Sequence, residues 1–263
     1  MDPRVGEPLL FGLGPERLFG CLHAVPAAPA TQAALILPPA GHEYLSAHRS
    51  VRQLALRLAD RGCTTLRMDL RGCGDAGGEK DSGNLAQWCE DAEQGLQLLA
   101  ERAPGAALHV IGLRLGASLA ALLGAQRARA GRPLASLTLW DAVVEGGDYL
   151  RAGLALQQAR HGMRQGADDD GPREVLGYRW SAALVDELRS LRLTTLKPAP
   201  AARVLLIDTR AALLTPLADH WRALGAALDS RHLEAPDLWS GDGQVALIPT
   251  AVLQAITDWL APA

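Results

Sequence analysis

The sequence predicts an α/β domain in which helices cover both faces of a mainly parallel sheet. Short continuous apolar runs, such as residues 33–37, 109–113 and 204–208, are typical of strands buried on both faces. Helical patterns separate these runs, as the crossover connections of parallel strands require. A third observation is the turn Gly112–Gly116, which joins an apolar run directly to a helix of small residues. Together these features predict one α/β core.

The elements can be assigned in chain order from apolar patterning and turn residues. Arg61 and Gly62 close the helix predicted at 46–60. Leu85, Trp88 and Leu96 lie near one face of the helix predicted at 84–102. Strands are predicted at 8–12, 17–25, 33–37, 63–70, 109–113, 134–140, 204–208 and 231–233. Helices are predicted at 46–60, 84–102, from the Gly112–Gly116 turn to about 127, at 217–228 and at 248–260.

One segment interrupts this alternation. Residues 148–198 are polar and helical in pattern, and the turn-forming stretch Gly166–Pro172 breaks them. We therefore expect a helical cap, residues 148–198, inserted into a core made of residues 1–147 and 199–263. The chain has no internal repeats.

Composition excludes several classes of function. The 263 residues carry a net charge of −3, and the arginines are scattered among acidic neighbours, which argues against a nucleic-acid surface. The four cysteines have no metal-ligand spacing, so no metal site is expected from them. We expect no other cofactor either. The first residues do not form a secretory signal, and no apolar run is long enough to span a bilayer. We therefore expect a cytoplasmic protein, while its oligomeric state stays open.

Three motifs resemble those of the α/β-hydrolase superfamily. The loop Asp69–Gly77 is similar to the family's D-x-R-G-x-G-x-S-x-G sequence, with Ala76 in place of the serine. The stretch Trp88–Asp91 matches W-x-x-D. The turn Gly112–Gly116 stands where the family has its nucleophile elbow, a sharp strand-to-helix turn that presents the catalytic residue. The resemblance spans nearly the whole chain and implies the α/β-hydrolase fold.

A narrower resemblance rests on three further stretches. Gly112–Ala117, Leu139–Gly146 and Leu176–Ser181 are similar to the "hydrolase 2" proteins associated with the bacterial exosortase A system. Those proteins also have an arginine at the elbow. The resemblance implies a link to exopolysaccharide biosynthesis, and it brings no settled activity with it.

The serine mechanism of such hydrolases needs a nucleophile, a base and an orienting acid. The nucleophile position holds Arg114, whose guanidinium stays protonated and cannot attack at neutral pH. The usual acid position falls on Ala211 or Ala212, and the segment 235–242 lacks the base histidine. His232 lies earlier, within a predicted strand. The absence of all three groups predicts that this mechanism has been lost.

A guanidinium at the elbow is suited to a different task. It offers a planar fork of N–H donors beside a helix N-terminus, and both features favour anions. An alternative interpretation is that Arg114 is closed off by an internal salt bridge, for which Asp141 is the expected partner. The predicted ligand-binding residues are Arg114, Leu113, Leu115, Gly41, Glu43 and Trp239, with His42 and Asp141 as catalytic candidates.

Other residues have plausible structural roles instead. His42 and Glu43 could form an acid–base pair or a plain surface pair. Trp140, Trp180 and Trp239 could line a cavity under the cap or belong to the core. Cys73 is a lone loop cysteine without an evident histidine partner, which favours an inert thiol.

Three functional hypotheses follow. The first is a non-serine site that binds a small anionic or acyl-type ligand at Arg114, which His42 or Asp141 would process. The second is a pseudohydrolase, an inactive fold that binds a protein partner. The third is an esterase or thioesterase whose nucleophile the sequence does not reveal.

Overall fold

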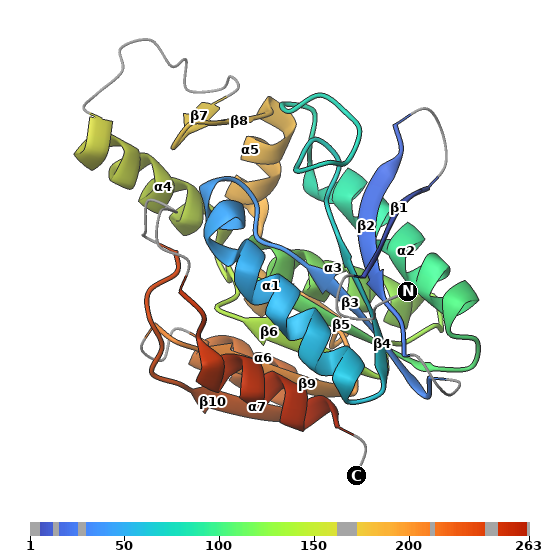
Figure 1. The fold of residues 1–263 in the computed structure, drawn as a ribbon. Helices are drawn as coiled ribbons and strands as arrows, with labels where there is room; N and C mark the ends of the chain where they lie inside the picture. The colour runs from blue at the N-terminus through green and yellow to red at the C-terminus, as the bar shows by residue number, and fades with distance from the viewer. Residues whose placement is uncertain are drawn as a thin grey trace.

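A computed structural model describes residues 6–12, 16–25, 30–161, 173–210, 214–239 and 247–261. Eight strands form one sheet in the order β1-β2-β4-β3-β5-β6-β9-β10 (Figure 1). They are β1 (Glu7–Phe11), β2 (Leu18–His23), β3 (Gln32–Leu37), β4 (Cys63–Met68), β5 (Ala107–Leu113), β6 (Ser136–Trp140), β9 (Arg203–Asp208) and β10 (Ala227–His232). β2 runs antiparallel to β1 and β4, and the other pairs are parallel. The predicted α/β architecture is confirmed.

Helices cover both faces of this sheet (Figure 1). One apolar cluster joins the sheet to α1 (His42–Asp60) and α7 (Thr250–Leu260). The other cluster joins it to α2 (Leu85–Arg102), α3 (Leu115–Arg129) and α6 (Thr215–Ala223). Continuous apolar strands such as β3, in which five of six residues are buried, need this cover on both sides. None of the described helices combines the length and apolar character needed to cross a membrane.

Three predicted boundaries are wrong. α1 begins at His42, four residues before the predicted start, so His42 and Glu43 are helical. α6 ends at Ala223, because Gly225 takes the left-handed conformation, with φ 90°, that closes helices. β10 then starts at Ala227, within the predicted helix. None of the six residues of this edge strand is buried and four of them are polar, so it lacks the apolar run that marks an inner strand.

The cap contains more than helices. α4 (Gly146–His161) leads into it, and α5 (Ala182–Ser190) and a 3₁₀ turn at Leu193–Thr195 follow later. Between them lies a hairpin, β7 (Arg173–Val175) and β8 (Tyr178–Trp180), which the sequence did not predict because three-residue strands show no periodicity. These elements lie together over one end of the sheet (Figure 1). The predicted break at Gly166–Pro172 lies outside the described residues, and the division into core and cap stays a prediction.

Candidate functional site at the strand-to-helix elbow

The elbow between β5 and α3 has the sharp geometry that its glycines predict. Arg114 takes φ 53° and ψ −120°, a conformation that side chains rarely adopt. The surroundings leave no room for larger residues: a Cβ on Gly112 would lie 2.4 Å from the Cα of Ala117, and one on Gly116 would lie 2.2 Å from the carbonyl oxygen of Pro38. The turn thereby places Arg114 at the carboxyl end of β5.

Arg114 is held from several sides and is only 8% exposed. Its Nε donates a hydrogen bond of 2.8 Å to Oε1 of Glu43, and its Nη1 donates one of 3.0 Å to the backbone carbonyl of Asp141. The guanidinium carbon lies 5.3 Å from the ring centre of Tyr149 and 5.6 Å from that of Trp239. The expected salt bridge to the Asp141 carboxylate is therefore wrong, and Glu43 is the partner.

Glu43 connects the elbow to the cap. Its second oxygen, Oε2, accepts a hydrogen bond of 2.8 Å from the hydroxyl of Tyr149. Burial raises the pKa of Tyr149, and the charge of Glu43 raises it further, so the hydroxyl stays protonated as a donor. For Arg114, burial opposes the charged form, but Glu43 outweighs it and the pKa is raised. Because Glu43 is 2% exposed, the interpretation of His42 and Glu43 as a surface pair is wrong.

Asp141 uses its carboxylate to fix neighbouring groups. Oδ1 accepts a bond of 2.7 Å from the backbone N–H of Thr209, and Oδ2 accepts bonds from the Thr209 hydroxyl and from Nε1 of Trp239, at 2.5 and 2.7 Å. The residue itself is in the left-handed region, with φ 48°, which turns its side chain toward these partners. Asp141 thus holds the indole of Trp239 beside Arg114.

His42 stands in the first turn of α1. Its Nε2 lies 3.2 Å from the carbonyl oxygen of Trp239, and a carbonyl can only accept, so Nε2 carries the hydrogen. Nδ1 is then the basic nitrogen, and it has no partner among the described residues. Burial lowers the pKa of His42 despite the nearby Glu43, so the imidazole is neutral at pH 7. This is the protonation state that a general base needs.

These side chains surround a cavity of about 180 Å³, which we call the elbow pocket. Its polar and aromatic lining comprises His42, Glu43, Arg114, Tyr149, Trp180, Arg210 and Trp239. Arg114 has five N–H groups, and the two bonds above leave three of them without a described partner. The side chain of Arg210 likewise has no partner among the described residues. With two arginines and one glutamate, the lining carries a formal charge of +1.

The remaining predicted site residues fall elsewhere. Leu113 and Leu115 are 0% and 1% exposed and lie outside the pocket lining, and Gly41 lines a neighbouring cavity instead. Trp140 is buried behind Trp239, with ring centres 5.4 Å apart. The triad-acid position at 211–212 and the segment 240–242 lie outside the described residues.

Sequence reasoning missed Tyr149 and Arg210 as site residues. Tyr149 comes from α4, at the start of the cap, where nothing in the sequence indicates which residues face the elbow. Arg210 lies two residues beyond the end of β9, and that position does offer a signal. Ligands of α/β sheets bind outside the carboxyl ends of the strands, so a charged residue there is a candidate.

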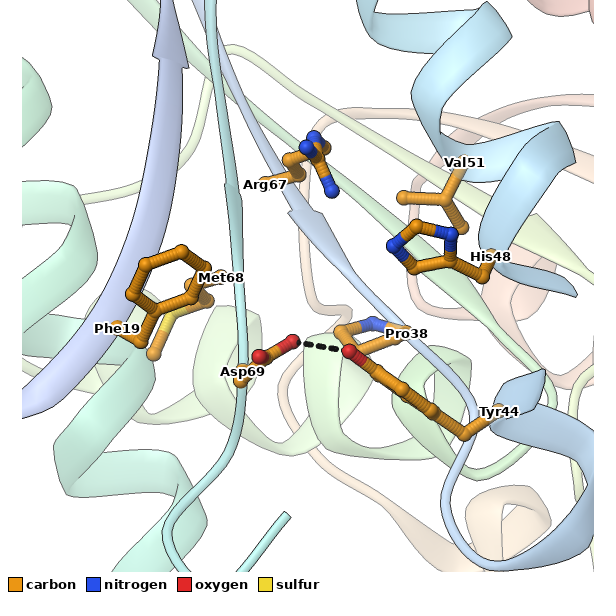
Figure 2. A pocket seen from close by; sticks show the side chains of 8 residues that line it. All are labelled: Phe19, Pro38, Tyr44, His48, Val51, Arg67, Met68 and Asp69. Atoms are coloured by element: carbon orange, nitrogen blue, oxygen red, sulfur yellow. Dashed lines mark hydrogen bonds between the residues drawn. The ribbon is translucent and has the colours of Figure 1, made fainter. Parts of the chain in front are cut away.

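The loop after β4 supports the first turn of α1, which carries His42. Figure 2 shows Tyr44 of α1 pointing to Asp69, whose Oδ1 accepts its hydroxyl hydrogen bond of 2.7 Å. The neighbouring cavity of about 20 Å³, which His48 and Arg67 also line, has room for roughly one water molecule. These contacts tie the first turn of α1, and with it His42, to the sheet.

The other half of the loop binds to α2. Arg71 donates a hydrogen bond of 3.0 Å to Oδ1 of Asp91, and Nε1 of Trp88 donates one of 2.9 Å to the Arg71 carbonyl. The D-x-R-G and W-x-x-D motifs are therefore parts of one structural connection. Among the described residues, no group of three histidine, cysteine or acidic side chains is placed to hold a metal ion.

Comparisons with known proteins agree with the observed fold. Residues 33–159 match the family model described as serine aminopeptidase, S33. Est1E from Butyrivibrio proteoclasticus, solved with ferulic acid bound, superimposes with a TM-score of 0.72 at 13% identity, over 96% of this chain and 97% of its own. The comparison with curated proteins finds no match.

Two further solved structures share the fold. An esterase from Pyrococcus furiosus has a TM-score of 0.65 at 14% identity and covers 98% of this chain and 91% of its own. A putative α/β hydrolase from Agrobacterium tumefaciens has a TM-score of 0.62 at 18% identity, with 97% and 94% covered. The strand order, the elbow geometry and these superpositions lead to one conclusion: this chain has the α/β-hydrolase fold.

Proposed function

We propose that the elbow pocket binds a small organic anion, with Arg114 occupying the position of the nucleophile and no serine attacking the ligand. The observation that carries this proposal is the cationic fork at the elbow. Three N–H groups of Arg114 are available beside the N-terminus of α3, and helix N-termini favour anions. Glu43 neutralises Arg114, so the uncompensated charge of the lining belongs to Arg210.

The walls of the pocket favour a flat or acyl-type body on that anion. Tyr149 and Trp180 stack with ring centres 5.8 Å apart and an interplanar angle of 22°, and Trp239 adds a third aromatic side chain to the lining. Aromatic walls with a few convergent polar groups are typical of small-molecule sites. Ferulic acid, the ligand of Est1E, has this combination of an aromatic ring and an acid group. We use it as the first probe.

The proposal gives His42 and Asp141 different tasks. His42 is the acid–base candidate, since its imidazole is neutral and its basic Nδ1, a buried atom, has no hydrogen-bond partner among the described residues. Asp141 acts by positioning Trp239, whose indole N–H hydrogen bond it accepts. We further propose, on the sequence resemblance alone, a cytoplasmic protein linked to the bacterial exosortase system.

A second candidate function is a pseudohydrolase that binds a protein partner. It is favoured by one specific observation, the dense set of contacts that already hold Arg114. The salt bridge to Glu43, the bond to the Asp141 carbonyl and the two aromatic rings would suit a purely structural arginine. An esterase mechanism has no comparable support at the elbow, because the residue there cannot attack.

Arg210→Gln is expected to weaken ferulate binding about tenfold, because it removes the exposed, unpaired cation of the elbow pocket. Isothermal titration calorimetry with ferulate measures this change. Arg222→Gln is the matched control, since Arg222 is an exposed arginine on α6 that pairs with Asp219 outside the pocket. Its affinity for ferulate should equal that of the wild type.

Two results would overturn the proposal. One is an Arg210→Gln variant that binds ferulate as tightly as the wild type does. The other is a wild-type protein that binds none of ferulate, benzoate and octanoate, which together sample aromatic and aliphatic acids. That second result would favour the pseudohydrolase.

A further inference from the structure

A second, larger cavity lies on the other side of Trp180. It measures about 390 Å³, and the loop after β4, the start of α1 and the cap hairpin enclose it. We call it the loop–cap cavity and define it by Arg71, Lys80, Trp88, Tyr178, Arg179 and Trp180. Trp180 lines this cavity and the elbow pocket alike, so one indole forms their common wall. The volume falls in the range of about 300–1,000 Å³ that small-molecule sites occupy.

The charged lining of the cavity is entirely basic. Three cationic residues contribute to it, and no acidic residue does among the described lining. Arg71 is already compensated, with Nη atoms 3.0 Å from Asp91 and 2.7 Å from Glu16. The other two cations are available for a ligand.

Lys80 and Arg179 are those available cations. Arg179 forms a salt bridge with Asp81 that is long, with Nη2 3.7 Å from Oδ2, and the two side chains are 69% and 40% exposed, so an anion can compete for the guanidinium. Lys80 has no partner among the described residues. They come from separate elements, the loop after β4 and strand β8, and meet at one cavity. A ligand with an anionic group between them would gain from both charges.

The rest of the lining suits an apolar body. Aromatic surface comes from Tyr44, Trp88, Tyr178 and Trp180. The loop wall is kept free of side chains by glycines that the backbone requires: Gly74 has φ 55°, and a Cβ there would lie 2.2 Å from Oδ2 of Asp69. The cavity is thus a built feature of the loop that carries the D-x-R-G motif.

The lining does not support covalent chemistry. Cys73 lines the cavity, but burial, together with the nearby charges of Asp69 and Asp91, raises the pKa of its thiol to about 12. The thiolate that would be needed as a nucleophile is therefore scarce at pH 7. The cavity is equipped to bind a ligand and not to acylate itself.

We propose that the loop–cap cavity is a second ligand site, which takes an organic anion with an aromatic body and holds its anionic group between Lys80 and Arg179. Carboxylates and phosphates share the required chemistry. This site is separate from the elbow pocket and does not depend on the function proposed for it.

The test titrates the full chain with 1-naphthyl phosphate, 1-naphthoate and the neutral 1-naphthol, and follows tryptophan fluorescence. We expect both anions to bind at least about tenfold more tightly than naphthol. The relative affinity of the two anions shows whether the site prefers a phosphate or a carboxylate. Lys80→Gln and Arg179→Gln should each weaken binding of the preferred anion about fivefold, because each removes one exposed cation. Lys197→Gln, at an exposed lysine outside the cavity, is the matched control and should change nothing.

The two sites can be told apart by exchanging variants and probes. Arg210→Gln should leave naphthyl phosphate binding unchanged, while Lys80→Gln should leave ferulate binding unchanged. The inference is overturned if naphthol binds as well as the anions, or if the double variant Lys80→Gln/Arg179→Gln binds them like the wild type. It is also overturned if Arg210→Gln weakens binding of the naphthyl anions while Lys80→Gln and Arg179→Gln do not. The naphthyl probes would then occupy the elbow pocket.

Discussion

Glu43→Ala is expected to lower the free energy of unfolding by about 3–5 kcal/mol, the usual cost of leaving a buried charge without its partner. Arg114 would lose its 2.8 Å salt bridge, and Tyr149 would lose the acceptor of its hydroxyl. Burial keeps water from replacing these bonds. Urea unfolding followed by circular dichroism measures the change.

Two further variants show whether the pairing itself causes this loss. Removing both charges, in Glu43→Ala/Arg114→Leu, should cost less than the sum of the two single changes, because neither charge is then left alone. Asp219→Ala breaks an exposed pair with Arg222 and should have little effect. Strictly additive losses in the double variant would show that Glu43 and Arg114 do not stabilise each other.

Gly116→Ala is expected to destabilise the protein by at least about 3 kcal/mol, a large effect for overpacking. The added Cβ would lie 2.2 Å from the carbonyl oxygen of Pro38 and 2.5 Å from that of Leu37. Both atoms are backbone at the end of a central strand, so they cannot turn aside as a side chain would. Thermal unfolding, or failure to obtain folded protein, measures the effect.

The matched control for this variant is another glycine with space around it. Gly147→Ala adds a methyl group whose nearest neighbour is the end of the flexible Arg151 side chain, at 3.5 Å. It should leave the melting temperature close to that of the wild type. A Gly116→Ala protein as stable as the Gly147→Ala protein would contradict the described approach of β3 to α3.

Much of the fold could be predicted from the sequence because its signals are local. Apolar runs identify the inner strands, and the two glycines of the elbow reflect contacts too close for any Cβ. The edge strand β10 and the hairpin β7–β8 were missed, since their stability comes from pairing with neighbours and not from their own pattern. Predicting Arg114 at the elbow required only its spacing between glycines.

The partner of Arg114 could not be predicted in the same way. Asp141 directly follows β6, the strand next to β5, and adjacency alone favours it as the salt-bridge partner. Its left-handed backbone turns the carboxylate to Thr209 and Trp239 instead. No local sequence pattern indicates that backbone conformation. Glu43 reaches the guanidinium because α1 begins four residues earlier than its apolar pattern indicates.

The central claim is that a cation has replaced the nucleophile at the elbow. The most direct test is to incubate the protein with a fluorophosphonate probe and measure the mass of the intact chain by mass spectrometry. An active serine esterase is treated in parallel. A nucleophilic serine in such a site reacts stoichiometrically, whereas an arginine does not. We predict an unchanged mass for this protein and a full shift for the esterase. One equivalent of probe on any serine of this chain would contradict the claim.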